Sequence, residues 1–154
     1  MLLFGIRFAS LFLTALLVGA IFGVWWGFDP APLTASAFVE MQQNAIRAMN
    51  VPAPVLGFVC IFLTAALAFF TRTDTRSRNL LIAAAVLLIT SGLITRFGNQ
   101  PINAIVMTWN PTTPPSNWTE LRDTWWSFHI MRTLAGMLAL ALSLVAALWR
   151  RPEV

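Results

Sequence analysis

Four long apolar segments alternate with shorter polar stretches along this chain of 154 residues. They cover about residues 8–28, 53–71, 80–98 and 124–149. A helix needs about 20 mostly apolar residues to cross the hydrocarbon of a bilayer. Short connections between such helices favour antiparallel neighbours. We therefore predict an all-α fold, a transmembrane up-down-up-down four-helix bundle that forms one domain over residues 1–154.

A shorter helix is predicted over residues 34–50, on the outer surface of the membrane. Its sequence is amphipathic, as is typical of helices that lie in the membrane interface. The apolar face carries Phe38, Met41, Ala45 and Met49, with Glu40, Gln43, Asn44 and Arg47 elsewhere.

The third apolar segment meets a proline near its end. Pro101 has no backbone N–H and its ring clashes with the carbonyl four residues back. We expect the helix to end or bend near residues 97–100. Residues 104–117, which contain three further prolines, are expected to form an outer loop.

Composition and charge place the protein in the membrane. Hydrophobic residues make up 58% of the chain and charged residues only 10%, whereas roughly a quarter of a soluble domain is charged. The net charge of +4 could suggest nucleic-acid binding, but its distribution argues for membrane topology instead. With both termini in the cytoplasm, that side carries six arginines against two acids: Arg7, Arg72, Arg76, Arg78, Arg150 and Arg151, against Asp74 and Glu153. The other side has four of each, so we predict a cytoplasmic-membrane protein with both termini inside and no nucleic-acid partner.

The first apolar segment has an alternative interpretation as a cleaved signal peptide, because Ala35-Ser36-Ala37 resembles a cleavage site. Its apolar run is longer than a signal core of about 7–15 residues, so we expect it to be retained as a helix. Gly19, Gly23 and Gly27 recur every four residues along it. Such spacing lets another helix approach closely, which makes this face a candidate for homo-oligomer contact.

Polar side chains recur on one face of the last predicted helix. Trp118, Arg122, Trp125, His129 and Arg132 follow alternating four- and three-residue steps, which place them on the same side of a helix. The same stripe continues as small residues, Gly136, Ala139 and Ser143. We expect close packing at the cytoplasmic half of the bundle and a wider polar chamber at the outer half.

The third helix carries a matching face, with Arg96, Asn99 and Asn103 at the same predicted depth. Arginine and asparagine near helix ends can also snorkel to headgroups or hydrogen-bond between helices without any chemistry. A structural pair between Glu40 and Arg132 would remove much of the functional signal. Without such a pair, a buried guanidinium calls for an anionic ligand or a wet cavity.

The only histidine is the candidate base. Burial and adjacent arginines disfavour the charged imidazolium, so His129 is expected to be neutral. Arginines and amide groups nearby would stabilise the anion that forms when a substrate gives up a proton.

These residues resemble a known family. Asn99-Gln-Pro101-Ile-Asn103, followed by Trp118-Thr-Glu-Leu121-Arg122, Trp125, His129 and Arg132, is similar to the pattern of the anthrone-oxygenase-like family of small four-helix membrane proteins. The resemblance implies a membrane oxygenase-like fold and, for the characterised fungal branch, oxidation of anthrones to anthraquinones by dioxygen.

The leading hypothesis is an oxidoreductase acting on a planar, lipid-soluble phenolic or anthrone-like molecule in an outward-facing pocket. His129, Arg132 and Arg122 would be catalytic, with Asn99, Asn103, Trp125, Trp118 and Arg96 binding the substrate. No cofactor is expected beyond dioxygen as co-substrate, because an electron-rich carbanion can react with it directly. Two alternatives stay open: a haem- or metal-binding protein with His129 as ligand, and a non-enzymatic lipid- or quinone-binding subunit.

Overall fold

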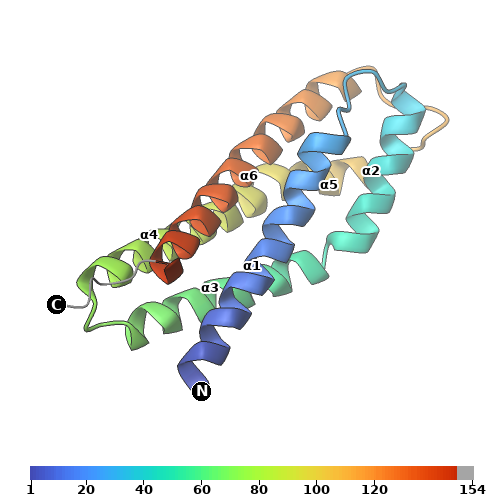
Figure 1. Cartoon of the computed structure of the whole chain (residues 1–154). Coiled ribbons are helices and arrows are strands. Elements are labelled where there is room, and N and C mark those ends of the chain that lie inside the picture. The colour runs from blue at the N-terminus through green and yellow to red at the C-terminus, as the bar shows by residue number, and fades with distance from the viewer. Residues whose placement is uncertain (149–154) are drawn as a thin grey trace.

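The computed structural model describes residues 1–148, and these are all helix or short connections. Four helical segments are long and apolar enough to cross a membrane. They are α1 (Leu2–Gly27), α3 (Pro52–Phe70), the continuous segment α4 (Thr75–Ile94), η1 (Thr95–Asn99) and α5 (Gln100–Val106), and α6 (Trp118–Leu148). Figure 1 shows them running up and down in one bundle. The prediction of an all-α transmembrane bundle is confirmed.

Two helices are longer than their apolar segments. α1 begins at Leu2 rather than near residue 8, and α6 begins at Trp118 rather than near residue 124. Helical hydrogen bonds are made by the backbone, so a helix continues past the point where its side chains turn polar. The predicted end of the last span at Trp149 and the predicted cytoplasmic charges Arg150, Arg151 and Glu153 lie outside the described residues.

The third span neither stops nor breaks at the proline. Residues 95–99 form a π-helical turn, in which the N–H of Gln100 donates to the carbonyl of Thr95. This wider turn accommodates Pro101, which has no N–H to donate and would clash in a regular helix. The chain then continues as α5 to Val106, so the expected loop starts after residue 106 and not at residue 104.

The amphipathic helix α2 (Ala35–Met49) matches the predicted residues 34–50 closely. Thr34 caps its first turn by accepting from the N–H of Ala37, at 3.3 Å. Its buried face agrees only in part with the predicted one: Phe38 is buried as expected, but Gln42 and Gln43 are buried as well. Gln43 donates to the carbonyls of Val106 and Trp109, at 3.0 and 2.9 Å, and so anchors α2 to the end of α5.

The two ends of the bundle are packed differently. The end that carries the first residue of α1 and the α3–α4 turn is called the terminal end here, and the opposite end the α2 end. Tight clusters fill the terminal half, where Cys60, Ala84 and Ala139 are completely buried. At Gly136, an added Cβ would lie 3.3 Å from Ile21 and 3.4 Å from Val18, so α1 and α6 are in close contact. The expected small-residue packing of this half is confirmed.

The α2 end holds a different cluster, formed by Ile46, Ile102, Val106 and Trp125. Its members come from α2, α5 and α6, with the partly buried Val24 of α1 packed against them. No residue of α3 belongs to this cluster among the residues described. At this end α3 borders a cavity instead of packing into the cluster.

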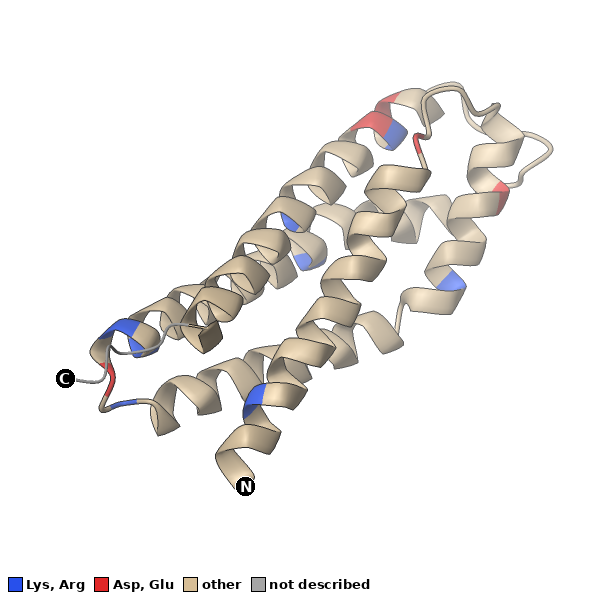
Figure 2. Cartoon of the chain, viewed as in Figure 1, with Lys and Arg blue, Asp and Glu red and all other residues tan. Residues whose placement is uncertain are grey.

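Charged residues are concentrated toward the ends of the bundle. Figure 2 shows the acidic positions at the two ends, and basic positions in the middle of the bundle with no acidic position beside them. Arg132 is the fifteenth of the 31 residues of α6, which puts it near the midpoint of that helix.

The glycines of α1 pack against nothing within the described chain. A Cβ added at Gly19, Gly23 or Gly27 would meet no atom within 4 Å. Association of two copies along this face stays a prediction. The segment that resembles a signal-peptide cleavage site, residues 35–37, forms the first turn of α2.

Candidate functional site

A cavity of about 750 Å³ lies between the helices toward the α2 end. Its walls come from all four spanning segments and from α2. Most lining side chains are apolar, which suits an apolar ligand of moderate size. The polar and charged lining is confined to Gln42, Asn50, Ser91, Thr95, Arg96, Gln100, Asn103 and Arg132, together with the indole of Trp125.

Arg132 brings a guanidinium to this cavity. Its Nη1 donates to the hydroxyl of Thr95 on η1, at 3.3 Å. Its Nε and Nη2 lie 3.2 and 2.8 Å from Nδ1 of His129. Within residues 1–148 no salt bridge reaches Arg132, and Glu40 is exposed on α2. The structural Glu40–Arg132 pair, which would have explained the arginine without a ligand, is absent from the described residues.

His129 lies directly behind Arg132 and is completely buried. Its Nε2 lies 3.0 Å from the carbonyl oxygen of Ile21 on α1. Because a carbonyl only accepts, Nε2 carries the proton and Nδ1 is the acceptor for Arg132. The imidazole is therefore neutral in this arrangement, as the sequence predicts.

Two indoles cover the imidazole. Trp125 is nearly parallel to it, with ring centroids 5.0 Å apart and planes at 8°. Trp126 also stacks on it, at 5.5 Å and 15°. Of these three rings, only Trp125 lines the cavity. His129 itself does not line the cavity, but it contacts Trp125 and Arg132, which do.

Asn103 and Trp125 form the polar wall opposite the apolar surface. The indole N–H of Trp125 donates to Oδ1 of Asn103, at 2.9 Å. The same oxygen accepts from Nε2 of Gln42, at 3.3 Å. This shared acceptor connects α2, α5 and α6, and fixes the plane of the Trp125 ring beside the cavity.

Asn99 is buried between η1 and α6 and does not line the cavity. Its amide nitrogen donates to the backbone carbonyl of Trp125, at 2.9 Å. Its Oδ1 has no hydrogen-bond partner among the described residues. The π-helical turn explains this position, since the wide turn rotates Asn99 toward α6 while Asn103 faces Trp125.

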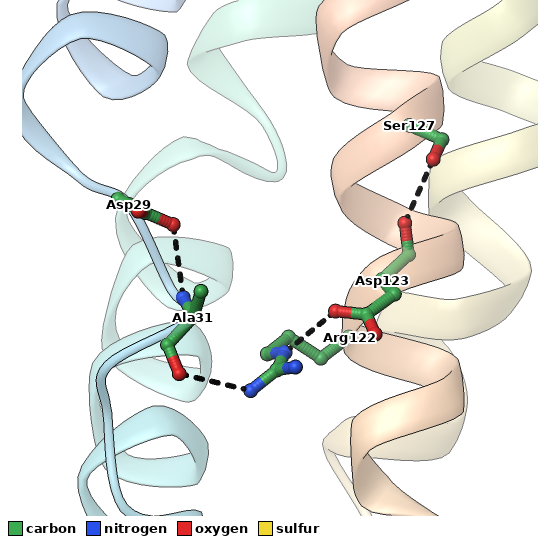
Figure 3. A network of polar contacts seen from close by, with 5 residues as sticks. All are labelled: Asp29, Ala31, Arg122, Asp123 and Ser127. Carbon is green, nitrogen blue, oxygen red and sulfur yellow. Dashed lines mark hydrogen bonds and ion pairs between the residues drawn. The ribbon is translucent and has the colours of Figure 1, made fainter.

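Arg122 and Trp118 lie apart from the cavity, at the beginning of α6. Figure 3 shows Arg122 between Asp123 and the connection that follows α1. Its Nε pairs with Asp123 at 2.8 Å, and its Nη1 donates to the carbonyl of Ala31 at 3.3 Å. The guanidinium lies 4.9 Å from the Trp118 ring. In this arrangement Arg122 joins the α1–α2 connection to α6.

Arg96 lies at the edge of the cavity and is exposed. The described residues give its guanidinium no hydrogen bond or ion pair, only the face of the adjacent Phe97 ring at 5.9 Å. An arginine within a membrane-spanning segment is expensive unless it has a partner or reaches water.

The structure thus brings together Arg132, Trp125, Asn103 and Arg96 at the cavity, with His129 behind them. Four contributors were not predicted as site residues: Gln42, Thr95, Trp126 and the Ile21 carbonyl. Gln42 had a sequence signal, because it falls three and four residues from the buried Val39 and Ile46. A backbone carbonyl on another helix has no such signal.

The metal alternative depends on which side chains lie together and on the state of the His129 ring. Among residues 1–148 there is no group of three or more His, Cys, Asp or Glu side chains that could hold a metal ion. Ligation of haem or metal by His129 would require a ring nitrogen to give up its present hydrogen bond.

The fold and the site together define a small helical membrane protein with a mostly apolar cavity and a guanidinium at its polar wall. Residues 41–142 match the family described as anthrone oxygenase, which covers more than half of the chain. The chain belongs to this family. No curated protein and no solved structure shows a significant match to it.

Proposed function

We propose that the protein is a membrane oxidoreductase that oxidises a planar, lipid-soluble phenolic or anthrone-like molecule with dioxygen. Family membership supports an oxygenase-like function. The observation that carries the proposal is the cavity, which is apolar over most of its wall and has two guanidiniums and, among residues 1–148, no carboxylate on its lining. An apolar ring system with one acidic group is complementary to such a surface.

The proposed reaction is balanced with one molecule of dioxygen. A proton leaves the CH₂ group opposite the ketone, and the electron pair moves onto the ketone oxygen as an enolate. The carbanionic carbon forms a C–O bond with dioxygen, giving a hydroperoxide once it is protonated. Loss of water across the O–O bond and the remaining C–H converts this carbon into a second carbonyl. One substrate and one dioxygen therefore give one quinone and one water.

Arg132 is assigned to the oxyanion. Its guanidinium lines the cavity, so a short movement away from His129 would bring its donors to the substrate oxygen, where they stabilise the developing negative charge. Trp125 offers a ring face for stacking, held in place by its bond to Asn103.

His129 is assigned to the proton. Its acceptor nitrogen is covered by Arg132, so proton transfer requires the guanidinium to leave Nδ1. The movement that brings the guanidinium to the substrate oxygen would uncover the lone pair at the same time. Anion binding and proton removal are therefore coupled in this proposal.

Anthrone oxidation by the purified protein in lipid vesicles tests the proposal. We expect uptake of one dioxygen per anthraquinone formed. Arg132→Gln should lower kcat/KM by about 100-fold or more, as loss of an oxyanion donor does elsewhere. Val86→Gln, on a lipid-exposed position of α4, is the matched control. Oxidation at the background rate by the wild-type protein, or full activity in Arg132→Gln, would contradict the proposal.

The proposed orientation puts the terminal end in the cytoplasm and the α2 end on the outer side of a cytoplasmic membrane. Arg7, Arg72, Arg76 and Arg78 all belong to the terminal end, with Asp74 the described acid there. This excess of positive charge is the pattern found in cytoplasmic loops. The cavity would then open toward the outer leaflet.

A further inference from the structure

Several residues that line the cavity are also exposed on the outside of the bundle. Phe58 on α3 is 73% exposed, and Leu93 and Ile89 on α4 are 51% and 43% exposed. A side chain can meet both surfaces only where the wall between them is incomplete. The cavity is therefore open between α3 and α4, and this gap is called the α3–α4 opening. Phe28 after α1 and Met49 at the end of α2 are also exposed lining residues, at 49% and 43%.

The limits of this opening are visible in the packing. Below it, toward the terminal end, Ile61 and Leu88 belong to the cluster that closes α3 against α4. Above it, Gln100 donates to Asn50 at 3.0 Å and joins α5 to the end of α2. Between residues 52–61 and 88–99 no hydrogen bond joins the two helices. In Figure 1, α3 and α4 start together at their connecting turn and separate toward the α2 end.

The opening faces hydrocarbon rather than water. Phe58 is six residues into α3, which places it about 9 Å along a helix that spans the membrane. The residues at its edge are apolar, apart from Arg96. Gly92 sits on the α4 edge, where an added Cβ would meet no atom within 4 Å, so the opening is not filled at this point.

Arg96 gives the opening a chemical preference. The described residues offer its guanidinium no anionic partner, and no acidic side chain lines the cavity. A molecule with an acidic group and an apolar body would pair its anion with Arg96 at the edge and with Arg132 further in.

We infer that the ligand enters sideways from the bilayer through the α3–α4 opening, and that Arg96 at its edge selects lipid-dissolved molecules carrying a carboxyl or phenol group. This inference rests on the cavity of the proposed function. It adds the route, the source of the ligand and a residue that discriminates between ligands before they reach Arg132.

Binding of 9-anthracenecarboxylate, dissolved beforehand in phosphatidylcholine vesicles that are then fused with vesicles containing the protein, provides the test. Association is followed by quenching of tryptophan fluorescence. Gly92→Trp fills the opening and should slow association by about tenfold or more, a larger effect than on the equilibrium affinity, although Gly92 also lines the cavity. Val86→Trp adds one tryptophan to an exposed position of the same helix outside the lining, and should bind at the wild-type rate.

A wild-type rate in Gly92→Trp would overturn the inference. Slow association in Ala20→Trp, with Gly92→Trp at the wild-type rate, would also overturn the inference. Ala20 lines the cavity on α1, so this result would indicate a different route. Arg96→Gln should weaken binding of 9-anthracenecarboxylate about tenfold while leaving neutral anthracene unaffected. Equal binding of both probes would contradict the selective role.

Oxygen uptake with anthrone, measured on the same samples, separates this inference from the proposed function. An unchanged association rate in Gly92→Trp together with anthrone oxidation would contradict the route and leave the reaction standing. Slow association in Gly92→Trp together with no oxidation by the wild-type protein would support the route and contradict the reaction.

Discussion

At the scale of single residues, the site consists of a guanidinium held against an imidazole. His129 accepts from Arg132 and donates to the carbonyl of Ile21, so both of its ring nitrogens are occupied. The Trp125, His129 and Arg132 face could be predicted from helical spacing alone, because the segment is a regular helix. The contact with Ile21 could not, since it depends on how α1 lies against α6.

The His129→Asn variant distinguishes two roles of His129, that of a general base and that of a residue that only positions Arg132. The Oδ1 of asparagine can take the place of Nδ1 as an acceptor, but it cannot hold a proton at neutral pH. We expect His129→Asn and His129→Ala to lose turnover alike, by about 100-fold or more, as loss of a general base does. The measurement is anthrone oxidation, with thermal unfolding in detergent as the check on folding. Near-normal turnover in His129→Asn would assign His129 to positioning Arg132.

At the scale of helices, the π-helical turn positions the third span. Sequence indicated a bend at Pro101 but not its kind, because an end, a kink and a π-helical turn all relieve the same missing N–H. The turn brings Gly98 against Phe128 of α6. This contact depends on the absence of a side chain at residue 98.

Gly98→Ala is expected to destabilise the protein. An added Cβ would lie 2.6 to 2.9 Å from three atoms of the Phe128 ring, so either this ring or the two helices would have to shift. Overpacking of this kind costs about 1–3 kcal/mol. Gly92→Ala is the matched control, since its Cβ would meet nothing within 4 Å. Unfolding in mixed detergent measures both variants, and equal stability would contradict the described packing.

The amphipathic helix shows a different limit of prediction. Its existence and its ends follow from Thr34 and from the alternation of apolar and polar residues. The predicted apolar face was only partly right, because it includes Phe38 but leaves out Gln42 and Gln43. They are buried since each finds an acceptor on or after α5, which composition alone does not reveal.

Gln43→Leu should loosen α2 without changing its apolar contacts greatly. The substitution leaves the carbonyls of Val106 and Trp109 without their donor. Interhelical hydrogen bonds in membrane proteins contribute about 0.6–2 kcal/mol, so we expect a small loss of stability. Limited proteolysis should cut the connections beside α2 faster in this variant. Asn44→Leu, an exposed position on the same helix, should be cut at the wild-type rate.

At the scale of the whole molecule, the four spans were predictable because hydropathy and length decide which segments enter a bilayer. The cavity was predicted only as a wider polar chamber in the outer half of the bundle, whereas most of its lining residues are apolar. Its opening between α3 and α4 depends on the angle at which those helices separate, which no local pattern records.

The arrangement in the membrane is tested with single cysteines in a Cys60→Ala background. Thr75→Cys lies at the terminal end and Asn117→Cys at the α2 end, and both positions are exposed. A membrane-impermeant thiol reagent added to intact cells should label Asn117→Cys and not Thr75→Cys. The reverse pattern would show that the terminal end faces outward and would contradict the proposed orientation.

The central claim is that Arg132 stabilises the anion of an acidic ligand inside the cavity, and the visible spectrum of bound 2-hydroxyanthraquinone measures this directly. Its phenol and phenolate forms absorb at different wavelengths. At a pH where the free compound is mostly neutral, we predict the phenolate band with the wild-type protein and the phenol band with Arg132→Gln. The same band in both proteins would contradict the account.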